Sequence, residues 1–284
     1  MKLLVALALV GLAGSALAEE FVAPIELDYH NKIGIPEAAR IKAAEEALDF
    51  DGGRIVGGAA AWLGAYPYMG GLVITLTTGA TSVCGSSLLS NTRAVTAAHC
   101  WQSTGGSARS FTVVLGSTTL FYGGTRVTTS DVTVHGSYNM WTLVNDVAII
   151  RLGWVNYNNN IRNIGLATGT NQFVGTWAWA AGFGRTSDNA NIGNNQFLSH
   201  VQVQVITNAV CQSTYGAATV QASTICVATT GGRGTCGGDS GGPLVANNQL
   251  IGITSFGHRD GCQRGFPAGF ARVTVFAPWI QSHL

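Results

Sequence analysis

One stretch of ten residues places the strongest constraint on how this chain folds. Residues 234–243 have the sequence Gly-Thr-Cys-Gly-Gly-Asp-Ser-Gly-Gly-Pro, so a single serine, Ser240, lies among five glycines. Glycines remove side chains that would crowd this serine and leave backbone N–H groups free to face a developing negative charge. A serine hydroxyl attacks only when a base takes its proton and the new charge is stabilised. The stretch therefore predicts a nucleophilic serine in a tight turn.

Two upstream motifs supply the groups that such a serine needs. Residues 96–100 are Thr-Ala-Ala-His-Cys, and residues 145–149 are Asn-Asp-Val-Ala-Ile. They provide a candidate base, His99, and a candidate orienting carboxylate, Asp146, in the chain order His, Asp, Ser. A histidine beside a cysteine is usually structural, and an aspartate before an apolar strand is often a turn residue. The three motifs in this order favour catalysis.

With these motifs and an Ile-Val-Gly-Gly sequence at residues 55–58, residues 55–284 resemble the chymotrypsin-like serine proteases. The resemblance implies an all-β fold of two six-stranded antiparallel β-barrels, with a short C-terminal helix and the active site between the barrels. It implies Ser240 as the nucleophile and His99 as the general base, with Asp146 holding His99 in its working tautomer.

The same resemblance assigns supporting roles. The backbone N–H groups of Gly238 and Ser240 would form the oxyanion hole, and Ser255 would hydrogen-bond to Asp146. Cleavage after Arg54 would free the α-amino group of Ile55, which then pairs with the carboxylate of Asp239. Before cleavage there is no amine to pair, which would keep the enzyme latent.

The first 54 residues differ in character from the rest. Residues 1–18 have a basic start, an apolar run and a final Ala-Leu-Ala, which predicts a secretory signal peptide rather than the alternative, a buried helix. Residues 19–54 hold nine acidic and four basic side chains and no cysteine. We interpret them as an activation propeptide, expect them to be mobile, and predict a helix within residues 36–48.

Six cysteines lie in the domain of residues 55–284, after the predicted signal peptide. An even count in an exported chain predicts three disulfides, for which fifteen pairings exist. A metal site is the alternative, but no tight ligand cluster is present in the sequence. The resemblance selects the pairing Cys84–Cys100, Cys211–Cys226 and Cys236–Cys262.

Short apolar runs between turn-forming residues predict strands in this domain, and only the end of the chain, around residues 276–283, predicts a helix. The strand runs are residues 72–76, 111–115, 147–152, 200–206 and 250–255.

Three residues are expected, by the resemblance, to shape the primary substrate pocket: Gly234 at its base, with Gly257 and Ala268 on its walls. No acid lies at the base, which disfavours cleavage after Lys or Arg. A neutral slot favours Phe, Tyr or Leu. Asp260 is expected near the rim of the pocket, and Ala268 stands where glycine is usual in vertebrate chymotrypsins.

Charge in the domain is carried in an unusual way. Residues 55–284 contain ten arginines and no lysine, against five aspartates and no glutamate. Arginine keeps its charge at pH values where lysine loses it. Lysine-poor, arginine-rich chymotrypsins resemble the digestive enzymes of the lepidopteran larval midgut, which is alkaline; compositional drift is the alternative. The arginines are scattered, which argues against nucleic acid as a partner.

The sequence thus predicts a secreted digestive endopeptidase that acts as a monomer in a gut lumen. Its expected partners are protein substrates, an activating trypsin-like protease and protein inhibitors of proteases, with no cofactor, metal or membrane. Two alternatives remain. One is a cascade protease with a single protein target, and the other is a non-catalytic binding protein on the same fold.

Overall fold

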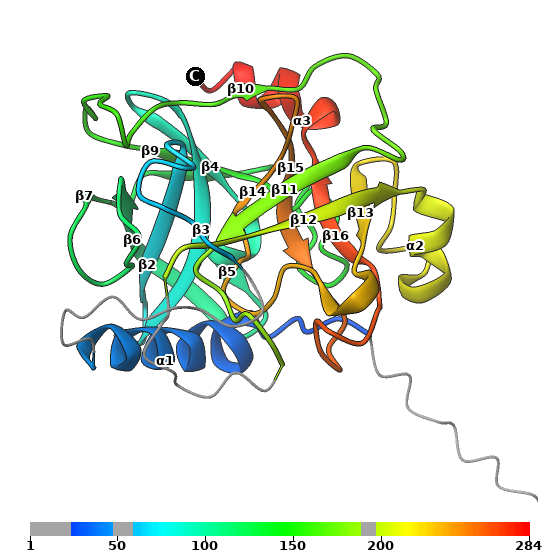
Figure 1. The fold of residues 1–284 in the computed structure, drawn as a ribbon, viewed down its shortest axis with the longest axis horizontal. Coiled ribbons are helices and arrows are strands. Elements are labelled where there is room, and N and C mark those ends of the chain that lie inside the picture. The colour runs from blue at the N-terminus through cyan, green and yellow to red at the C-terminus, as the bar shows by residue number, and fades with distance from the viewer. Residues whose placement is uncertain (1–23, 48–58, 189–196) are drawn as a thin grey trace, which may run out of the picture.

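The computed structural model describes residues 24–47, 59–188 and 197–284, and in it two β-sheets form the body of the protein (Figure 1). The predicted signal-peptide residues 1–18 and the predicted cleavage junction at Arg54 and Ile55 lie outside the described residues.

The first sheet is built from eight strands in the order β5-β6-β2-β3-β4-β9-β8, with β7 paired to β6. Its pairings are antiparallel. Side chains such as Leu72, Phe111 and Ile149 are fully buried and form its core. The strands are β2 (Met69–Leu76), β3 (Thr81–Ser90), β4 (Arg93–Thr96), β5 (Gln102–Ser103), β6 (Gly106–Leu115), β7 (Thr125–Thr129), β8 (Val132–Val134) and β9 (Ala148–Arg151).

The second sheet also has eight strands, in the order β1-β12-β11-β14-β15-β16-β13, with β10 paired to β15. A further pairing of β12 with β13 closes this sheet into a barrel. Its own core includes Val203, Ile225 and Phe270. The strands are β1 (Ala59–Ala60), β10 (Gly165–Leu166), β11 (Trp177–Gly182), β12 (Ser199–Ile206), β13 (Thr224–Ala228), β14 (Pro243–Ala246), β15 (Gln249–Phe256) and β16 (Ala268–Arg272).

The expected architecture of two barrel-like sheets is confirmed. Four of the predicted strand runs lie in β2, β6, β12 and β15, and the run 147–152 extends one residue beyond each end of β9. The count of eight strands in each sheet, where six were expected, includes two-residue strands such as β1, β5 and β10. One of these, β10, pairs with β15 in parallel.

Helices are few among the described residues, and α1 and α3 lie on opposite sides of the molecule (Figure 1). The predicted terminal helix is confirmed as α3, although it begins earlier, directly after β16. The helices are a π-helical turn, η1 (His30–Gly34), then α1 (Ile35–Glu46), the 3-10 turns η2 (Ala98–Cys100) and η3 (Thr230–Gly232), α2 (Asn208–Tyr215) and α3 (Val273–Gln281).

Three disulfides link the cysteines in the pairing that the resemblance implied: Cys84–Cys100, Cys211–Cys226 and Cys236–Cys262. The first joins β3 to η2, and the third joins the loop before Ser240 to the loop before β16. These links fix the two loops that the sequence singles out for chemistry.

None of the helices in the described parts of the chain has both the length and the apolar character needed to cross a membrane.

The expectation that residues 19–54 are mobile is wrong for residues 24–47. These residues form η1 and α1, and side chains including Tyr29, Glu37 and Ile41 are buried against the domain. The predicted helix exists, with Pro36 in its first turn. No disulfide holds this segment, but its apolar face is buried against the domain. The absence of cysteines therefore does not make it mobile.

Candidate functional site

The carboxylate of Asp146 is the centre of a buried network of hydrogen bonds. Its Oδ1 accepts from the backbone N–H of His99 at 2.9 Å, and its Oδ2 lies 2.7 Å from Nδ1 of the same histidine. The Ser255 hydroxyl donates to Oδ2 at 2.5 Å. Asp146 is only 1% exposed. Such a carboxylate fixes the imidazole ring with Nδ1 protonated and leaves Nε2 as the basic nitrogen.

Strand pairing brings these residues together. Thr96, at the end of β4, pairs with Ala148 at the start of β9, so the chain just after β4 lies beside the chain just before β9. His99 therefore faces Asp146 although 47 residues separate them. Ser255 comes from β15 of the second sheet, so the network joins both sheets.

Ser240 lies at the turn that leads into β14. Its carbonyl accepts from the N–H of Gly85 in the first sheet at 2.7 Å, while the next residue, Gly241, donates to Thr254 in the second sheet at 2.7 Å. Gly238 has φ +98°, and a β-carbon there would lie 2.9 Å from the Cα of Gly184. The glycines therefore permit both the turn and the close approach of a neighbouring loop, and the oxyanion-hole role of Gly238 and Ser240 stays a prediction.

Tyr29, from the segment before α1, lies against His99 and lines the same cleft as Ser240. Its ring centroid is 4.7 Å from that of His99, and its hydroxyl donates to the carbonyl of Val83 at 2.7 Å. Burial raises the pKa of Tyr29, and a hydrogen bond with the Ser240 side chain opposes that rise. Within the described structure, Nε2 of His99 is buried and has no hydrogen-bond partner. Tyr29 belongs to the segment predicted to be a propeptide, so a residue of that segment contacts the candidate base.

Tyr29, His99 and Ser240 all line one cleft of about 280 Å³. Its domain side includes Phe256 at the end of β15 and Gly257 directly after it. It also includes Gly237 from residues 234–242, which we call the serine loop. The opposite side is formed by residues of the segment before and within α1, including Glu26, Leu27, Tyr29, Lys32, Ile33 and Glu37.

The three predicted pocket residues do not all line this cleft. Gly257 does. Gly234 instead lines a separate cavity of about 50 Å³, which it shares with Asp239. Ala268 is buried in β16, within the core of the second sheet. Their roles in substrate selection stay predictions.

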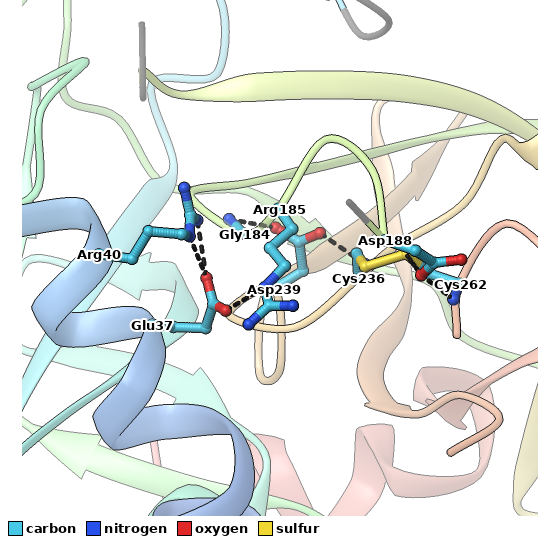
Figure 2. Close-up of polar contacts among 8 residues, drawn as sticks. All are labelled: Glu37, Arg40, Gly184, Arg185, Asp188, Cys236, Asp239 and Cys262. Carbon is cyan, nitrogen blue, oxygen red and sulfur yellow. Dashed lines mark hydrogen bonds and ion pairs between the residues drawn. A yellow bond between two sulfur atoms is a disulfide. The ribbon is translucent and has the colours of Figure 1, made fainter. Parts of the chain in front are cut away.

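Asp239, the residue before the candidate nucleophile, points at the loop after β11 that contains Gly184 (Figure 2). Its carboxylate accepts from the backbone N–H groups of Gly184 at 2.8 Å and Cys236 at 2.9 Å. Removal from water raises the pKa of Asp239 to about 6, although both hydrogen bonds oppose the rise; the charge of Glu37 adds to it, and that of Arg40 lowers it. Among the described residues, no cation lies within ion-pair distance of this carboxylate.

Sequence reasoning missed several residues of the site. Phe256 lines the cleft next to Ser255, and Asp188 accepts hydrogen bonds from the N–H groups of Cys262 and Gln263 at 2.7 and 3.1 Å. Their partners lie far away in the chain, so no local pattern marks them. Asp260, expected near the rim, is exposed and its N–H donates to His258 at 3.2 Å.

Two groups of residues in the described structure have the composition of a metal site. One comprises Cys84, His99 and Cys100, and the other Asp188, Cys236 and Cys262. In each, both sulfurs belong to one disulfide, and a metal binds the thiolate form of cysteine. Neither group therefore offers the ligands of an ordinary zinc site.

Comparison with known proteins agrees with this geometry. The family model described as Trypsin matches residues 55–280. The chain is 39% identical over 236 residues to a collagenase of Hypoderma lineatum, covering 81% of this chain and 87% of that protein. It is 41% identical over 232 residues to a brachyurin of Leptuca pugilator, covering 80% and 97%.

A solved structure titled HL collagenase superposes with a TM-score of 0.74 at 38% identity and covers 81% of this chain and 98% of that one. The family match and the extent of these relatives lead to one conclusion: the chain belongs to the trypsin family of serine proteases.

Proposed function

We propose that the chain is the secreted zymogen of a serine endopeptidase of chymotrypsin type, which digests proteins in an alkaline gut lumen. The observation that carries the proposal is the buried pairing of His99 with Asp146 at 2.7 Å, in a cleft that both His99 and Ser240 line. The mature enzyme acts as a monomer on protein and peptide substrates. Its other partners are an activating trypsin-like protease and protein inhibitors of proteases.

The geometry supports an acyl-enzyme mechanism. Nε2 of His99 accepts the Ser240 proton as the hydroxyl oxygen attacks the substrate carbonyl, while Asp146 stabilises the imidazolium that forms. The N–H groups of Gly238 and Ser240 stabilise the oxyanion, a contribution of about 3–4 kcal/mol for one such donor in related chemistry. His99 then returns the proton to the leaving amine, and water releases the acyl group by the same steps in reverse.

Cleavage after large apolar residues is supported by the charges around the predicted pocket base, Gly234, which lines the cavity of about 50 Å³, and around the cleft. Gly234 provides no carboxylate for a substrate cation, and a cation without a partner is costly to remove from water. Asp188 is the carboxylate of the domain that lines the cleft among the described residues, and it already accepts hydrogen bonds from the N–H groups of Cys262 and Gln263. The relatives include proteins named trypsin as well as collagenase, so their names do not decide between the two preferences.

We expect the activated enzyme to hydrolyse peptides after Phe, Tyr or Leu at least ~100-fold better than after Arg or Lys, which corresponds to about 2.7 kcal/mol. The measurement is kcat/KM over a peptide series that differs only in the residue before the cleaved bond. Ser240→Ala is the blank, with less than ~1% of the wild-type rate, because loss of a triad member costs a factor of about 10⁴ or more. A higher kcat/KM after Arg would refute the pocket assignment.

Activation by cleavage after Arg54 is supported by the surroundings of Asp239. A carboxylate whose pKa is raised to about 6 by burial is one that gains from a cation, and this one adjoins a cavity of about 50 Å³. We infer that the new α-amino group of Ile55 enters this cavity and pairs with Asp239. The pair then holds the serine loop in its working conformation.

Trypsin treatment is expected to produce active enzyme whose first residues are Ile55-Val56-Gly57, and the Arg54→Gln chain is expected to stay inactive under the same treatment. N-terminal sequencing and an assay on a Phe peptide measure the two outcomes. An active product that starts at another residue, or activity in the intact Arg54→Gln chain, would contradict this route.

The raised pKa of Asp239 also predicts how stability depends on pH. From an ordinary value of 3.8 to about 6, the folded zymogen holds a proton that the unfolded chain has released. The free energy of unfolding therefore falls as pH rises from about 4 to 6, by at most about 1.4 kcal/mol per pH unit from this group. Urea unfolding of the Ser240→Ala zymogen, with and without Asp239→Asn, isolates the contribution as the difference in slope.

After cleavage the sign should change, because pairing with Ile55 stabilises the charged form of Asp239 and lowers its pKa. The cleaved Ser240→Ala protein should lack this fall in stability. An identical slope before and after cleavage would show that Ile55 does not reach Asp239.

The alkaline habitat is supported by the charge of the domain. With ten arginines and no lysine in residues 55–284, the positive surface persists above pH ~10.4, where lysines lose their charge. Arg109, for example, is exposed on β6, where its charge contributes to this surface.

We expect kcat/KM to hold at least about half of its maximum up to pH ~10. A free α-amine has a pKa near ~8, and holding its proton to pH ~10 requires pairing with Asp239 to raise it by about two units. The pair's contribution is complete below the unpaired value and is lost as pH rises through the paired one. A profile of kcat/KM from pH 7 to 11 tests this; a fall that begins below pH ~9 would refute the alkaline role and leave the protease assignment intact.

A further inference from the structure

The segment of residues 24–47, which we call the cleft segment, lies across the active site. Near its start, the carbonyl of Pro24 accepts from the N–H of Arg259 at 2.9 Å, and Ile25 is buried with Leu143 and Phe256. Near its end, Glu45 accepts from the N–H groups of Leu120 and Phe121 at 2.5 and 2.7 Å. The segment therefore bridges loops of both sheets and passes over the cleft between these two ends.

Tyr29 is the point at which the cleft segment contacts the catalytic residues. Its side chain is 4% exposed, lies edge-on to His99, donates a hydrogen bond to the Val83 carbonyl, and lines the same cleft as Ser240. A substrate must place its carbonyl carbon next to the Ser240 oxygen for attack. Tyr29 fills part of the cleft that His99 and Ser240 line, so substrate and Tyr29 exclude one another.

Glu37, on α1, anchors the segment beside the serine loop. Its carboxylate is fully buried and forms ion pairs with Arg40 at 2.7 Å and with Arg185 of the domain (Figure 2). Ile33 lies over the same loop, where a β-carbon on Gly237 would be 3.2 Å from its Cγ2. A buried ion pair of this kind is costly to break from one side only, because the remaining charge has no partner.

The buried face of α1 supplies apolar contact. Ala38 and Ile41 pack into a cluster with Met69, Val83 and Phe183 of the domain. Gly34 allows this approach, because any β-carbon there would collide with the Ser82 side chain of β3. Tyr29 thus forms a central aromatic contact, and the apolar contacts of α1 and the ion pairs of Glu37 surround it. Inhibitor interfaces combine contacts of these kinds.

Charge complements shape. Residues 19–54 carry a net charge of −5 (nine acidic, four basic), and residues 55–284 carry +5 (ten arginines, five aspartates). Opposite net charges favour association and speed it. No cysteine lies in residues 19–54, so after a cut at Arg54 only non-covalent contacts hold the cleft segment.

Resting on the function proposed above, we propose that the cleft segment is an inhibitor of its own active site that stays bound after cleavage at Arg54, with Tyr29 as its blocking residue. Every contact just described between the cleft segment and the domain joins a residue of 24–47 to a residue after Ala59, so a cut at Arg54 removes none of them. Latency then has two layers. Cleavage supplies the Ile55 amine, and dissociation or digestion of the cleft segment opens the cleft.

The test uses the full chain with one clean cut. Phe50→Asp, Gly52→Asp, Gly53→Asp and Arg54→Lys create the tetra-aspartyl-lysine recognition sequence of enteropeptidase directly before Ile55. This avoids trypsin, which also recognises Lys32 and Lys42 within the cleft segment. After complete cleavage, gel filtration and mass spectrometry determine whether the segment stays with the domain, and a Phe peptide reports specific activity at micromolar and nanomolar protein.

The cleaved wild-type chain is expected to retain the segment and to gain at least ~10-fold in specific activity on dilution. Tyr29→Ala is expected to be fully active at both concentrations, and Tyr29→Phe, which keeps the ring but loses the hydroxyl, to lie between them. The matched control is Lys42→Ala, because Lys42 is on the same helix with its side chain 57% exposed. It should behave as wild type.

Full activity of the wild-type chain at micromolar concentration directly after cleavage would overturn the proposal, as would equal behaviour of Tyr29→Ala and wild type. Unfolding curves of the uncleaved Tyr29 variants verify that the domain is folded. Retention is also measured on the cleaved Ser240→Ala chain. If the segment stays bound there while the wild-type enzyme is inactive at every dilution, the proposed activity has failed and the binding has not.

Discussion

The buried carboxylate of Asp146 is the interaction on which the site depends. It receives two hydrogen bonds from His99, which follows β4 in the first sheet, and one from Ser255 of β15 in the second. Burial of a charged carboxylate without hydrogen-bond donors costs much free energy. The donors come from both sheets, so the same requirement that orients His99 also holds the two halves of the protein against each other.

Two further carboxylates, those of Asp239 and Glu37, lie at the serine loop. Asp239 is held by two backbone N–H groups and has its pKa raised to about 6. Glu37 adds to that rise while it engages Arg185, whose own N–H donates to Gly237 at 2.9 Å. The cleft segment thus influences the serine loop through the charge of Glu37 and fills part of the cleft with the ring of Tyr29.

The relatives bear on only part of this arrangement. The family model matches residues 55–280, which leaves the cleft segment outside the comparison. The fold, the disulfides and the His99–Asp146 pair therefore agree with the family, whereas the docking of residues 24–47 rests on this chain alone. Its apolar contacts with Val83 and Phe183 and its ion pair with Arg185 are the physical basis for treating it as a ligand.

The sequence by itself predicted His99, Asp146 and Ser240 as candidate site residues, and it determined the strand runs and the helix before the domain, because each is encoded in a short local pattern. Only the tertiary structure decided what that helix does. The burial of Tyr29 against His99, and of Glu37 against Arg185, joins residues that are 70 and 148 positions apart. No periodicity or motif encodes such contacts, since they arise from shape and charge that exist only once both sheets have formed. A segment without a cysteine is expected to be mobile, yet apolar burial and ion pairs hold residues 24–47 in the cleft without a disulfide.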